Sequence, residues 1–428
     1  MNIQNKIRKR KAIIGIIGLG YVGLPLFVNF IKSNFKVYGF DIDKKKIKSL
    51  NQGISYINHV DFNFINNQDN NSYNLTTDFS KIKDVDIIIL CLPTPLNKKK
   101  VPDLSYIKNT ISLIKNYLSE NQVISLESTT YPGCTRELIY KPLKDKFDVG
   151  SNFNIIYSPE REDPGNNQFR LKEIPKVISG YSENCLQIAK LIYGSIFEKV
   201  VPVKNLETAE LTKLYENIFR SVNISLVNEL KFFTYRIGVD VNEIIKAAST
   251  KPFGFMPFSP GPGLGGHCIP IDPIYLSWKA KSIGVSTDFI NTSYKVNLKT
   301  TKRVFKIVNN YINSLKHKKS ILIIGIAYKK NVDDIRESPA LKLIENFYKN
   351  KYDIAYHDPF IKKFPQNRNY YINLKSKALT SGLIKKYKYT LICTDHDKID
   401  YEIIYKYSTK IFDSRNIFSF FDDKIIQV

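Results

Sequence analysis

The chain has 428 residues, enough for two or three domains that each bury a core of their own. Hydrophobic residues make up 43% of it and charged residues 24%, which is the composition of a folded protein and excludes a disordered chain. The formal charge is +24, but the lysines lie in short, scattered groups such as 44–46 and 98–100. We therefore expect no nucleic-acid partner, although the charge is compatible with a small anionic substrate.

An uncharged run from Ala12 to Ile31 follows basic residues at 6–11 and resembles a signal peptide or a membrane span. Four glycines, Pro25 and Asn29 interrupt its apolar character, and no second segment of this kind follows. The run therefore predicts a buried strand, a turn and a helix, with no membrane partner.

A glycine motif, Gly18-Leu19-Gly20-Tyr21-Val22-Gly23, lies between an apolar strand predicted at 12–17 and an amphipathic stretch at 24–32. Gly18 permits a tight turn, Gly20 lets the backbone approach a pyrophosphate, and Gly23 lets the helix pack closely on the strand. The phosphates would bind the unpaired N–H groups of the helix N-terminus. The bland alternative is a tight turn without a ligand.

Asp41 ends a second strand, predicted at 36–40, about 20 residues after the glycines, where a carboxylate can bind the adenosine ribose diol. Its charge would repel the 2′-phosphate of NADP. The sequence therefore predicts NAD, held by Asp41 and by Gly18, Gly20, Tyr21, Val22 and Gly23.

Strand and helix patterns then alternate, which predicts a doubly wound parallel sheet. Its further strands are expected near 86–92, 122–127, 153–157, 176–180 and 199–203. A long helix at 207–238 and a helical stretch at 288–315 follow, and then strands near 320–325, 352–356, 389–393 and 410–413. We predict an α/β protein with two Rossmann-like domains, at 1–204 and 316–428, joined by a helical central domain at 205–315. The last domain lacks a second GxGxxG, so we expect it to bind the nucleotide of a substrate.

A glycine-rich loop at 260–273 contains Cys268, and Asp272 lies where a helix at 273–281 is expected to begin. A helix N-terminus stabilises a thiolate, which makes Cys268 a candidate nucleophile; a buried structural cysteine is the alternative. The five cysteines are odd in number and widely spaced, which excludes a disulfide framework and fits a reducing cytoplasm. His267 adjoins Cys268, but neighbouring side chains diverge, so we expect no metal.

Six motifs in order carry a family resemblance: Gly18 to Pro25, Ser128-Thr129-Thr130, Ser158-Pro159-Glu160-Arg161, Glu210-Leu211-Thr212-Lys213-Leu214-Tyr215-Glu216-Asn217, Gly263 to Pro273, and Ala327-Tyr328-Lys329 with Arg336-Glu337-Ser338. Over nearly its whole length the chain resembles the UDP-glucose/GDP-mannose 6-dehydrogenase family. It is most similar to the bacterial members that oxidise UDP-N-acetylglucosamine for surface polysaccharides, through residues 158–166, 253–257 and 265–273.

The resemblance implies oxidation of a sugar-nucleotide alcohol at C6 to a carboxylate, with two NAD+ consumed per turnover. It implies that Cys268 captures the aldehyde as a thiohemiacetal and then carries a thioester. Lys213 and Asn217, four apart on the long helix, would stabilise the reacting oxygen, although solvent-facing residues are the usual fate of such a pair. Glu160 would activate the hydrolytic water, with help from Asp272 and Thr129.

Further roles follow from the resemblance. The substrate would contact Glu160, Arg161, Lys213, Asn217, Arg220, Gly265, Lys329 and Arg415, and the cofactor would also contact Thr94, Thr129 and Arg336. Arg415 suits a diphosphate because its planar fork binds phosphate oxygens in pairs. The chain departs from UDP-glucose-oxidising relatives at Asp163-Pro164-Gly165, where they carry a second glutamate.

The substrate and the class of protein stay open at this point. UDP-N-acetylglucosamine is the first candidate substrate, and UDP-N-acetylmannosamine, UDP-N-acetylgalactosamine and UDP-glucose are the others. A two-electron NAD-dependent hydroxyacid dehydrogenase and a basic binding protein are the alternatives from other classes.

The long helix carries two apolar stripes, so we predict a homodimer or a larger even assembly through the central helices, in agreement with the resemblance. One stripe comprises Leu211, Leu214, Ile218, Val222, Ser225 and Glu229, and the other comprises Phe219, Leu226, Leu230 and Phe233. The alternative is a monomer whose cysteine loop and 288–315 helix cover both stripes.

Overall fold

The computed structural model of the protein describes residues 1–57, 60, 62–66, 71–161, 169–266, 269–315, 319–365, 372–420 and 422–428. The chain divides into two compact units. The first comprises Met1–Glu216 and Ile274–Gly284, and the second comprises Asn217–Pro273 and Val285–Val428. The three-domain division expected from the sequence stays a prediction.

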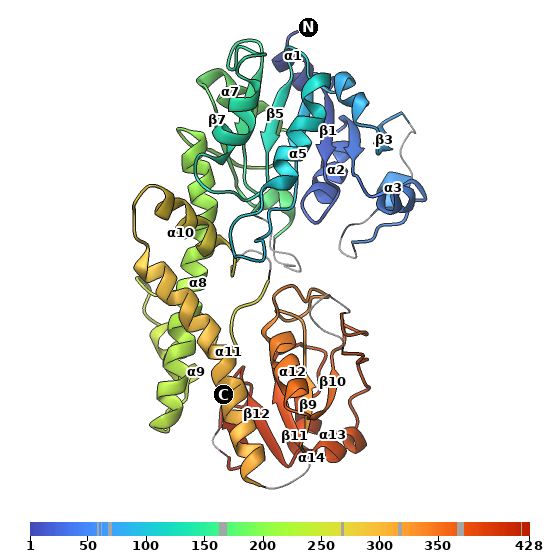
Figure 1. The fold of residues 1–428 in the computed structure, drawn as a ribbon. Helices are drawn as coiled ribbons and strands as arrows, with labels where there is room; N and C mark the ends of the chain where they lie inside the picture. Colours follow the sequence, from blue (N-terminus) through green and yellow to red (C-terminus); the bar gives the residue numbers. More distant parts are fainter. Residues whose placement is uncertain are drawn as a thin grey trace. The chain divides into compact units, whose positions relative to one another are not determined.

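The first unit is built on a sheet with the strand order β3-β2-β1-β4-β5-β6-β7-β8 (Figure 1). Its strands are β1 (Ile13–Ile17), β2 (Lys36–Phe40), β3 (Tyr73–Thr76), β4 (Ile87–Leu90), β5 (Val123–Leu126), β6 (Asn154–Tyr157), β7 (Lys176–Gly180) and β8 (Val200–Pro202). The order from β3 to β6 is that of a dinucleotide-binding fold, in which ligands bind beyond the carboxyl ends of β1 and β4.

Helices cover this sheet because its strands are apolar on both faces. They are α1 (Ile3–Arg8), α2 (Gly23–Lys32), α3 (Lys44–Asn51), α4 (Asn63–Asn66), α5 (Ser105–Ile114), α6 (Lys141–Leu143) and α7 (Glu183–Tyr193). Phe27 and Phe30 of α2 and Ile188 and Ile192 of α7 share one buried cluster with strand residues such as Ile14. At roughly 25 cal/mol per Å², this burial is the main source of stability in the unit.

Four helices follow: α8 (Leu206–Arg236), α9 (Val241–Ala248), α10 (Asp272–Ser282) and α11 (Asp288–Ser314). The first of them, α8, is one continuous helix that passes from the first unit into the second. None of the helices in the described part of the chain combines the length and apolar character that crossing a membrane requires.

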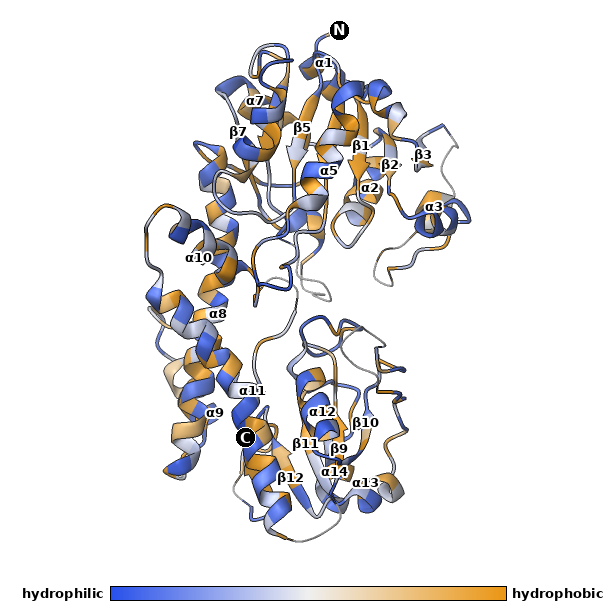
Figure 2. Ribbon diagram, in the orientation of Figure 1, coloured by the Kyte–Doolittle hydropathy of each residue, from blue (hydrophilic) through white to orange (hydrophobic). Residues whose placement is uncertain are grey.

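The second unit contains a parallel sheet with the order β10-β9-β11-β12-β13. Its strands are β9 (Ser320–Ile324), β10 (Asp353–His357), β11 (Tyr389–Ile392), β12 (Lys410–Asp413) and β13 (Ile425–Gln427). Helices α11 and α12 (Pro339–Lys349) pack on one face, and α13 (Ser381–Tyr387) and α14 (Tyr401–Tyr407) pack on the other. Figure 2 shows the strands mainly in orange and α11 in alternating colours, as buried strands and an amphipathic helix require.

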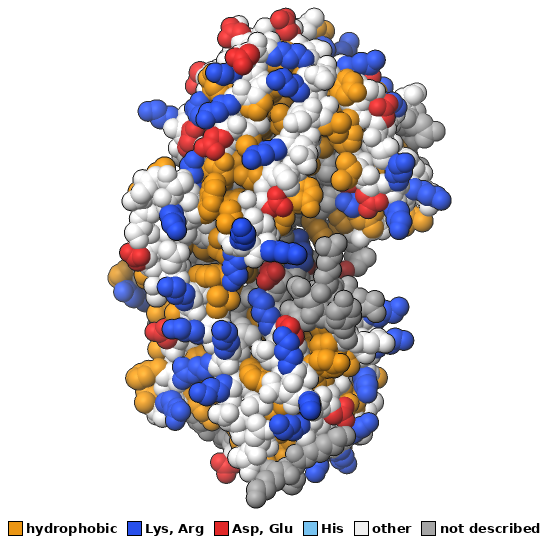
Figure 3. Space-filling model, viewed as in Figure 1, with side chains coloured by type: hydrophobic (Ala, Val, Ile, Leu, Met, Phe, Trp, Pro, Cys, Tyr) orange, Lys and Arg blue, Asp and Glu red, His pale blue; other side chains and the backbone are white. Residues whose placement is uncertain are grey.

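The predicted fold class is confirmed, with one correction. The sequence predicts an all-parallel first sheet, whereas β7 runs antiparallel to β6, and β8 pairs in parallel with β7. The strands β3 and β13 and the helices α1 and α9 were not predicted, because short or polar segments give a weak periodic signal. On the face drawn in Figure 3, Lys and Arg side chains are dispersed among polar and apolar groups, as the scattered lysines of the sequence suggest.

Candidate active site

The glycine turn after β1 has the geometry that a dinucleotide requires. Gly18 has φ +92°, and an added Cβ would lie 2.4 Å from the carbonyl oxygen of Cys91. A Cβ on Gly23 would lie 1.9 Å from the carbonyl oxygen of Gly18, so only glycine lets α2 approach the strand. At Gly20 an added Cβ would meet nothing within 4 Å, so the backbone there is open to a ligand. The turn therefore fits NAD.

Asp41 lies beside this turn, at the carboxyl end of β2. Its side chain is 6% exposed and accepts a hydrogen bond from the Leu19 amide at 3.0 Å. Lys46 of α3 forms an ion pair with Asp41 at 3.1 Å. The sequence analysis missed Lys46; its place in the first turn of the helix after Asp41 is the signal that could have identified it. Tyr21 is 42% exposed, and the carbonyl of Thr94, which is buried, accepts from the Tyr275 hydroxyl at 3.0 Å.

Glu160 lies in a charged cluster at the carboxyl edge of the same sheet. The Lys176 ammonium lies 3.3 Å from a Glu160 carboxylate oxygen and 2.5 Å from Glu127. Glu127 and Lys176 are buried, while the Glu160 side chain is 12% exposed. Sequence reasoning found Glu160 but missed its two partners. The signal that could have identified them is a charged residue at the end of an apolar strand, because Glu127 directly follows β5 and Lys176 begins β7.

Lys213 projects from α8 with only 6% of its surface exposed, so the solvent-facing interpretation of this residue is wrong. Arg161 pairs with Glu216 at 2.7 Å and donates to the carbonyl of Pro175 at 2.6 Å. Thr129 is partly exposed after β5. All of these residues belong to the first unit.

In the second unit, Asn217 links two other predicted site residues. Its amide donates to a carboxylate oxygen of Asp272 at 2.6 Å, and its amide oxygen accepts from the Arg220 guanidinium at 2.9 Å. Asn217 is 1% exposed and Asp272 is 2% exposed. The structure therefore brings together Asn217, Arg220 and the first residue of α10.

The loop that leads to Cys268 is anchored within the second unit. The Gly261 amide donates to Asn228 of α8 at 2.7 Å, Thr301 of α11 donates to the Pro262 carbonyl at 2.8 Å, and the Gly266 amide donates to the Arg336 carbonyl at 2.8 Å. A Cβ on Gly265 would lie 2.8 Å from the Cβ of Tyr328, which explains the glycine there. Cys268 and His267 lie outside the described residues.

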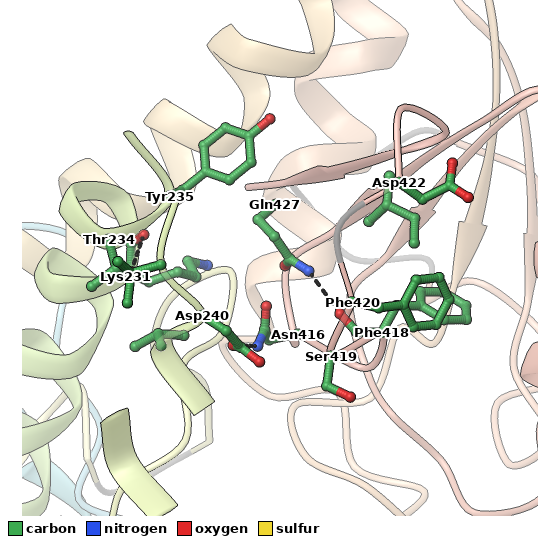
Figure 4. Close-up of a pocket in the computed structure, with 13 residues that line it drawn as sticks. Lys231, Thr234, Tyr235, Asp240, Asn416, Phe418, Ser419, Phe420, Asp422 and Gln427 are labelled. Atoms are coloured by element: carbon green, nitrogen blue, oxygen red, sulfur yellow. Dashed lines mark hydrogen bonds between the residues drawn. The ribbon is translucent and has the colours of Figure 1, made fainter. Parts of the chain in front are cut away.

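Lys231 of α8 fastens the start of this loop and was missed by sequence reasoning. Its buried ammonium donates to the carbonyls of Gly261 at 3.1 Å and Ser414 at 3.2 Å, and to that of Val428. Burial lowers the pKa of Lys231 to about 7, although the negative charge of Asp413 partly offsets this shift. Lys231 also lines a cavity of about 20 Å³, which Asn416 and Gln427 of the C-terminal segment line as well (Figure 4). This volume is close to that of one water molecule, so we assign no substrate to it.

The three basic residues assigned to the C-terminal domain lie beyond the carboxyl ends of its strands. Arg415 follows β12 and donates to the Cys393 carbonyl at 2.8 Å, and its guanidinium lies within 2.8 Å of the position a Gly261 Cβ would take. Arg336 pairs with Asp334 at 2.6 Å. Lys329 is partly exposed beside the ring of Tyr328. The cysteine loop, Arg336 and Arg415 are therefore neighbours in this unit.

The fold and these residues define an NAD-binding oxidoreductase with a second nucleotide-binding domain. Three family models match: the NAD-binding domain of the UDP-glucose/GDP-mannose dehydrogenase family at 12–197, its central domain at 207–299, and its UDP-binding domain at 322–420. The chain belongs to this family and is an NAD-dependent UDP-sugar dehydrogenase.

Curated relatives and solved structures agree with this assignment. The chain is 34% identical over 384 residues to UDP-N-acetyl-D-glucosamine 6-dehydrogenase of Salmonella typhi, covering 86% of this chain and 87% of that one. It is 33% identical over 429 residues to UDP-N-acetyl-D-mannosamine dehydrogenase of Methanocaldococcus jannaschii, covering 97% and 94%. The structure of the UDP-D-ManNAc dehydrogenase of Pyrococcus horikoshii superposes with a TM-score of 0.85 at 28% identity, covering 97% and 98%.

A metal site was not expected from the sequence. Among the described residues, no group of three or more His, Cys, Asp and Glu side chains could hold a metal ion. His267 and Cys268 lie outside that search, so the absence of a metal stays a prediction.

Proposed function

We propose that the protein oxidises a UDP-N-acetylhexosamine at C6 to the uronic acid, through a covalent adduct on Cys268, for surface polysaccharide biosynthesis. The observation that carries this proposal is the burial of Lys213 and Asn217, four residues apart on α8. Burying a lysine costs several kcal/mol unless its charge is compensated, and Asn217 is held by Asp272 and Arg220, so neither residue is an ordinary solvated residue of the helix surface. Both belong to the motif that the family resemblance assigns to the reacting oxygen.

The first steps form the adduct. Bound NAD+ supplies the hydride acceptor in each of the two oxidations. Lys213 and Asn217 supply hydrogen-bond donors for the C6 oxygen as negative charge develops on it. The Cys268 thiolate then bonds to the aldehyde carbon, and loss of a second hydride from this thiohemiacetal leaves a thioester. Capture by sulfur prevents release of the aldehyde.

The last step is hydrolysis. Water attacks the thioester carbon while Glu160 takes a proton from the water, and the carbon–sulfur bond breaks to release the Cys268 thiolate and the sugar acid. Asp272 assists as an adjacent base, and its hydrogen bond to Asn217 fixes its orientation. Thr129 helps to hold the water.

UDP-N-acetylglucosamine is the first candidate substrate because the relative from Salmonella typhi bears that name. UDP-N-acetylmannosamine is supported almost equally by relatives at 33% identity, and UDP-N-acetylgalactosamine and UDP-glucose are further alternatives. The four sugars differ at C2 and C4, so the shape of the pocket around these two carbons would decide which sugar is the substrate.

A spectrophotometric assay with NAD+ and a panel of UDP-sugars tests the function. We expect two NADH for each sugar acid formed, because both hydrides leave the same carbon, and the highest kcat/KM with UDP-N-acetylglucosamine. A ratio of one NADH per sugar, with release of an aldehyde, would instead indicate a two-electron dehydrogenase. Comparison of kcat/KM among the sugars identifies the substrate.

A further inference from the structure

Three charged side chains that come from different strands meet at the carboxyl edge of the first sheet. Glu127 follows β5, Glu160 follows β6, and Lys176 is the first residue of β7. Lys176 is 1% exposed, Glu127 is 0% exposed, and the Lys176 ammonium contacts both carboxylates. A buried lysine is costly unless it is paired, so the cluster requires an explanation.

The reversed direction of β7 brings Lys176 to this edge. Tyr157, the last residue of β6, pairs with Ser179, so the start of β7 extends past the end of β6. Lys176 therefore lies alongside the segment that follows β6 and donates to the carbonyl of Pro159 at 3.1 Å. In a parallel arrangement the first residue of β7 would lie at the opposite edge of the sheet.

Glu127 holds Lys176 from the other side. One of its carboxylate oxygens accepts from Lys176 at 2.5 Å, and the other accepts from the hydroxyl of Tyr193 on α7. Tyr193 lies 2.7 Å from the hydroxyl of Ser125. Burial opposes the charged form of Lys176, yet the two carboxylates outweigh burial and raise its pKa. Lys176 is thus a fixed cation within a network of hydrogen bonds.

Other titratable groups border this cluster. Burial raises the pKa of the Cys91 thiol after β4, and the charges of Glu127 and Glu160 raise it further, so Cys91 is neutral. The amide of Arg161 donates to Glu160 at 2.7 Å, whereas its guanidinium pairs with Glu216 of α8. Burial also raises the pKa of Glu127, although Lys176 opposes this shift. Among the described residues, Lys176 is the cation in direct contact with Glu160.

We propose that Lys176 is a positioning residue that keeps the Glu160 carboxylate ionised and oriented to take a proton from the hydrolytic water, and that Glu127 holds Lys176 in place. The proposal rests on the proposed function, in which Glu160 is the base of thioester hydrolysis. A cation within about 4–6 Å of a carboxyl group lowers the pKa of that group by about one or more and so favours the ionised form. Glu160 then stays competent as a base at lower pH than it would alone.

Two variants that act in opposite directions test this. Glu127→Gln removes a negative charge, while the amide oxygen can still accept from Lys176 and the amide nitrogen can donate to the Tyr193 hydroxyl, so the Lys176 cation stays beside Glu160. Lys176→Met combined with Glu127→Gln removes both members of the fully buried pair, and the charge that remains is that of Glu160, whose side chain is 12% exposed. The measurement is the steady-state rate of NADH formation between pH 5 and 9, after the initial burst, with mass spectrometry of the acylated enzyme.

We expect the acidic limb of the rate profile to move to lower pH in Glu127→Gln and to higher pH, by about one unit, in the double variant. Acylated enzyme should accumulate in the double variant near pH 6. If Lys176 and Glu127 served only to stabilise the fold, the two variants would shift their pH profiles in the same direction. That result, or two unshifted profiles, would overturn the proposal. If the double variant fails to fold, Lys176→Gln with Glu127→Gln, which keeps hydrogen-bonding groups at both positions, replaces it and should show the same shift to higher pH.

Two further variants complete the test. Lys172→Met with Glu198→Gln removes an exposed ion pair at 3.1 Å and should leave the profile unchanged. Glu160→Gln separates the two hypotheses. If it hydrolyses the thioester at the wild-type rate, the proposed base is wrong. If it is slow while the Lys176 variants behave like wild type, only the role of Lys176 is wrong.

Discussion

Replacement of Cys268 by serine should abolish formation of the sugar acid, with a loss of at least about a thousandfold in kcat. A serine hydroxyl is a far weaker nucleophile than a thiolate at neutral pH, so the aldehyde would not be captured. The affinity for NAD should stay close to that of the wild type, because the glycine turn that holds the cofactor is a separate part of the chain. Acid formation is measured by chromatography, and NAD affinity by titration.

Cys185→Ser is the matched control. Cys185 is buried on α7, and its sulfur lies 3.3 Å from the Ser182 hydroxyl and 3.5 Å from an amide oxygen of Asn154, so a hydroxyl there would find polar partners. We expect this variant to retain activity. A Cys268→Ser enzyme that forms acid as fast as the wild type would exclude the covalent mechanism, whatever the control does.

The dinucleotide site could be predicted from the sequence because its residues are local. Gly18, Gly20 and Gly23 lie within one turn, and Asp41 ends the next strand, so the spacing alone determines their proximity. The structure adds the reason for each glycine, such as the 1.9 Å approach that excludes a side chain at Gly23. The two Rossmann-like folds were predicted for a similar reason, since apolar strand patterns that alternate with helical patterns give a strong signal.

The cluster around Glu160 could not be predicted in the same way, because its formation depends on the direction of one strand. A parallel β7 would place Lys176 at the edge opposite to Glu127 and Glu160. No residue of the apolar run at 176–180 distinguishes the two directions, since a buried strand has the same composition in either. The family resemblance supplied Glu160 and Arg161 but neither Lys176 nor Glu127.

The contact between Asn217 and Asp272 also exceeded what residue patterns can predict. The two residues are far apart in the chain; the resemblance named Asn217, and Asp272 was first singled out for its place at a predicted helix start. Their hydrogen bond depends on how α8 meets the start of α10, which is a matter of tertiary packing. The burial of Lys213 is a second case, because helical spacing predicts a shared face but not which face is buried.

The exposed side of α8 leads to a prediction about assembly. Phe219, Leu226 and Phe233 are spaced seven residues apart and therefore share one face, and they are 40%, 65% and 62% exposed. They belong to the second predicted stripe, of which Leu230 is partly buried. On the first stripe Leu214, Ile218 and Ser225 are buried as expected for a packed face, whereas Leu211 and Glu229 are exposed. Large aromatic and aliphatic side chains in a row on one helix are typical of an interface.

We therefore propose a homodimer, or a larger even assembly, in which this face of α8 meets its copy around a two-fold axis. Phe233→Glu should convert the assembly to monomers at micromolar concentration. Each partner would lose the burial of one phenylalanine, about 1.5–3 kcal/mol, and would have to bury a carboxylate instead. Since about 1.4 kcal/mol is a tenfold change in Kd, two such losses weaken the dimer by at least about a hundredfold.

Light scattering after size exclusion measures the mass, and Leu113→Glu is the control. Leu113 is 47% exposed on α5, in the first unit, so the same substitution there adds the same charge without touching the α8 face. The control should keep the mass of the wild type. A wild-type protein with the mass of one chain would refute the assembly. An unchanged dimer in Phe233→Glu would show that the two-fold contact uses a different surface, because a pair of carboxylates facing each other across the axis could not be accommodated.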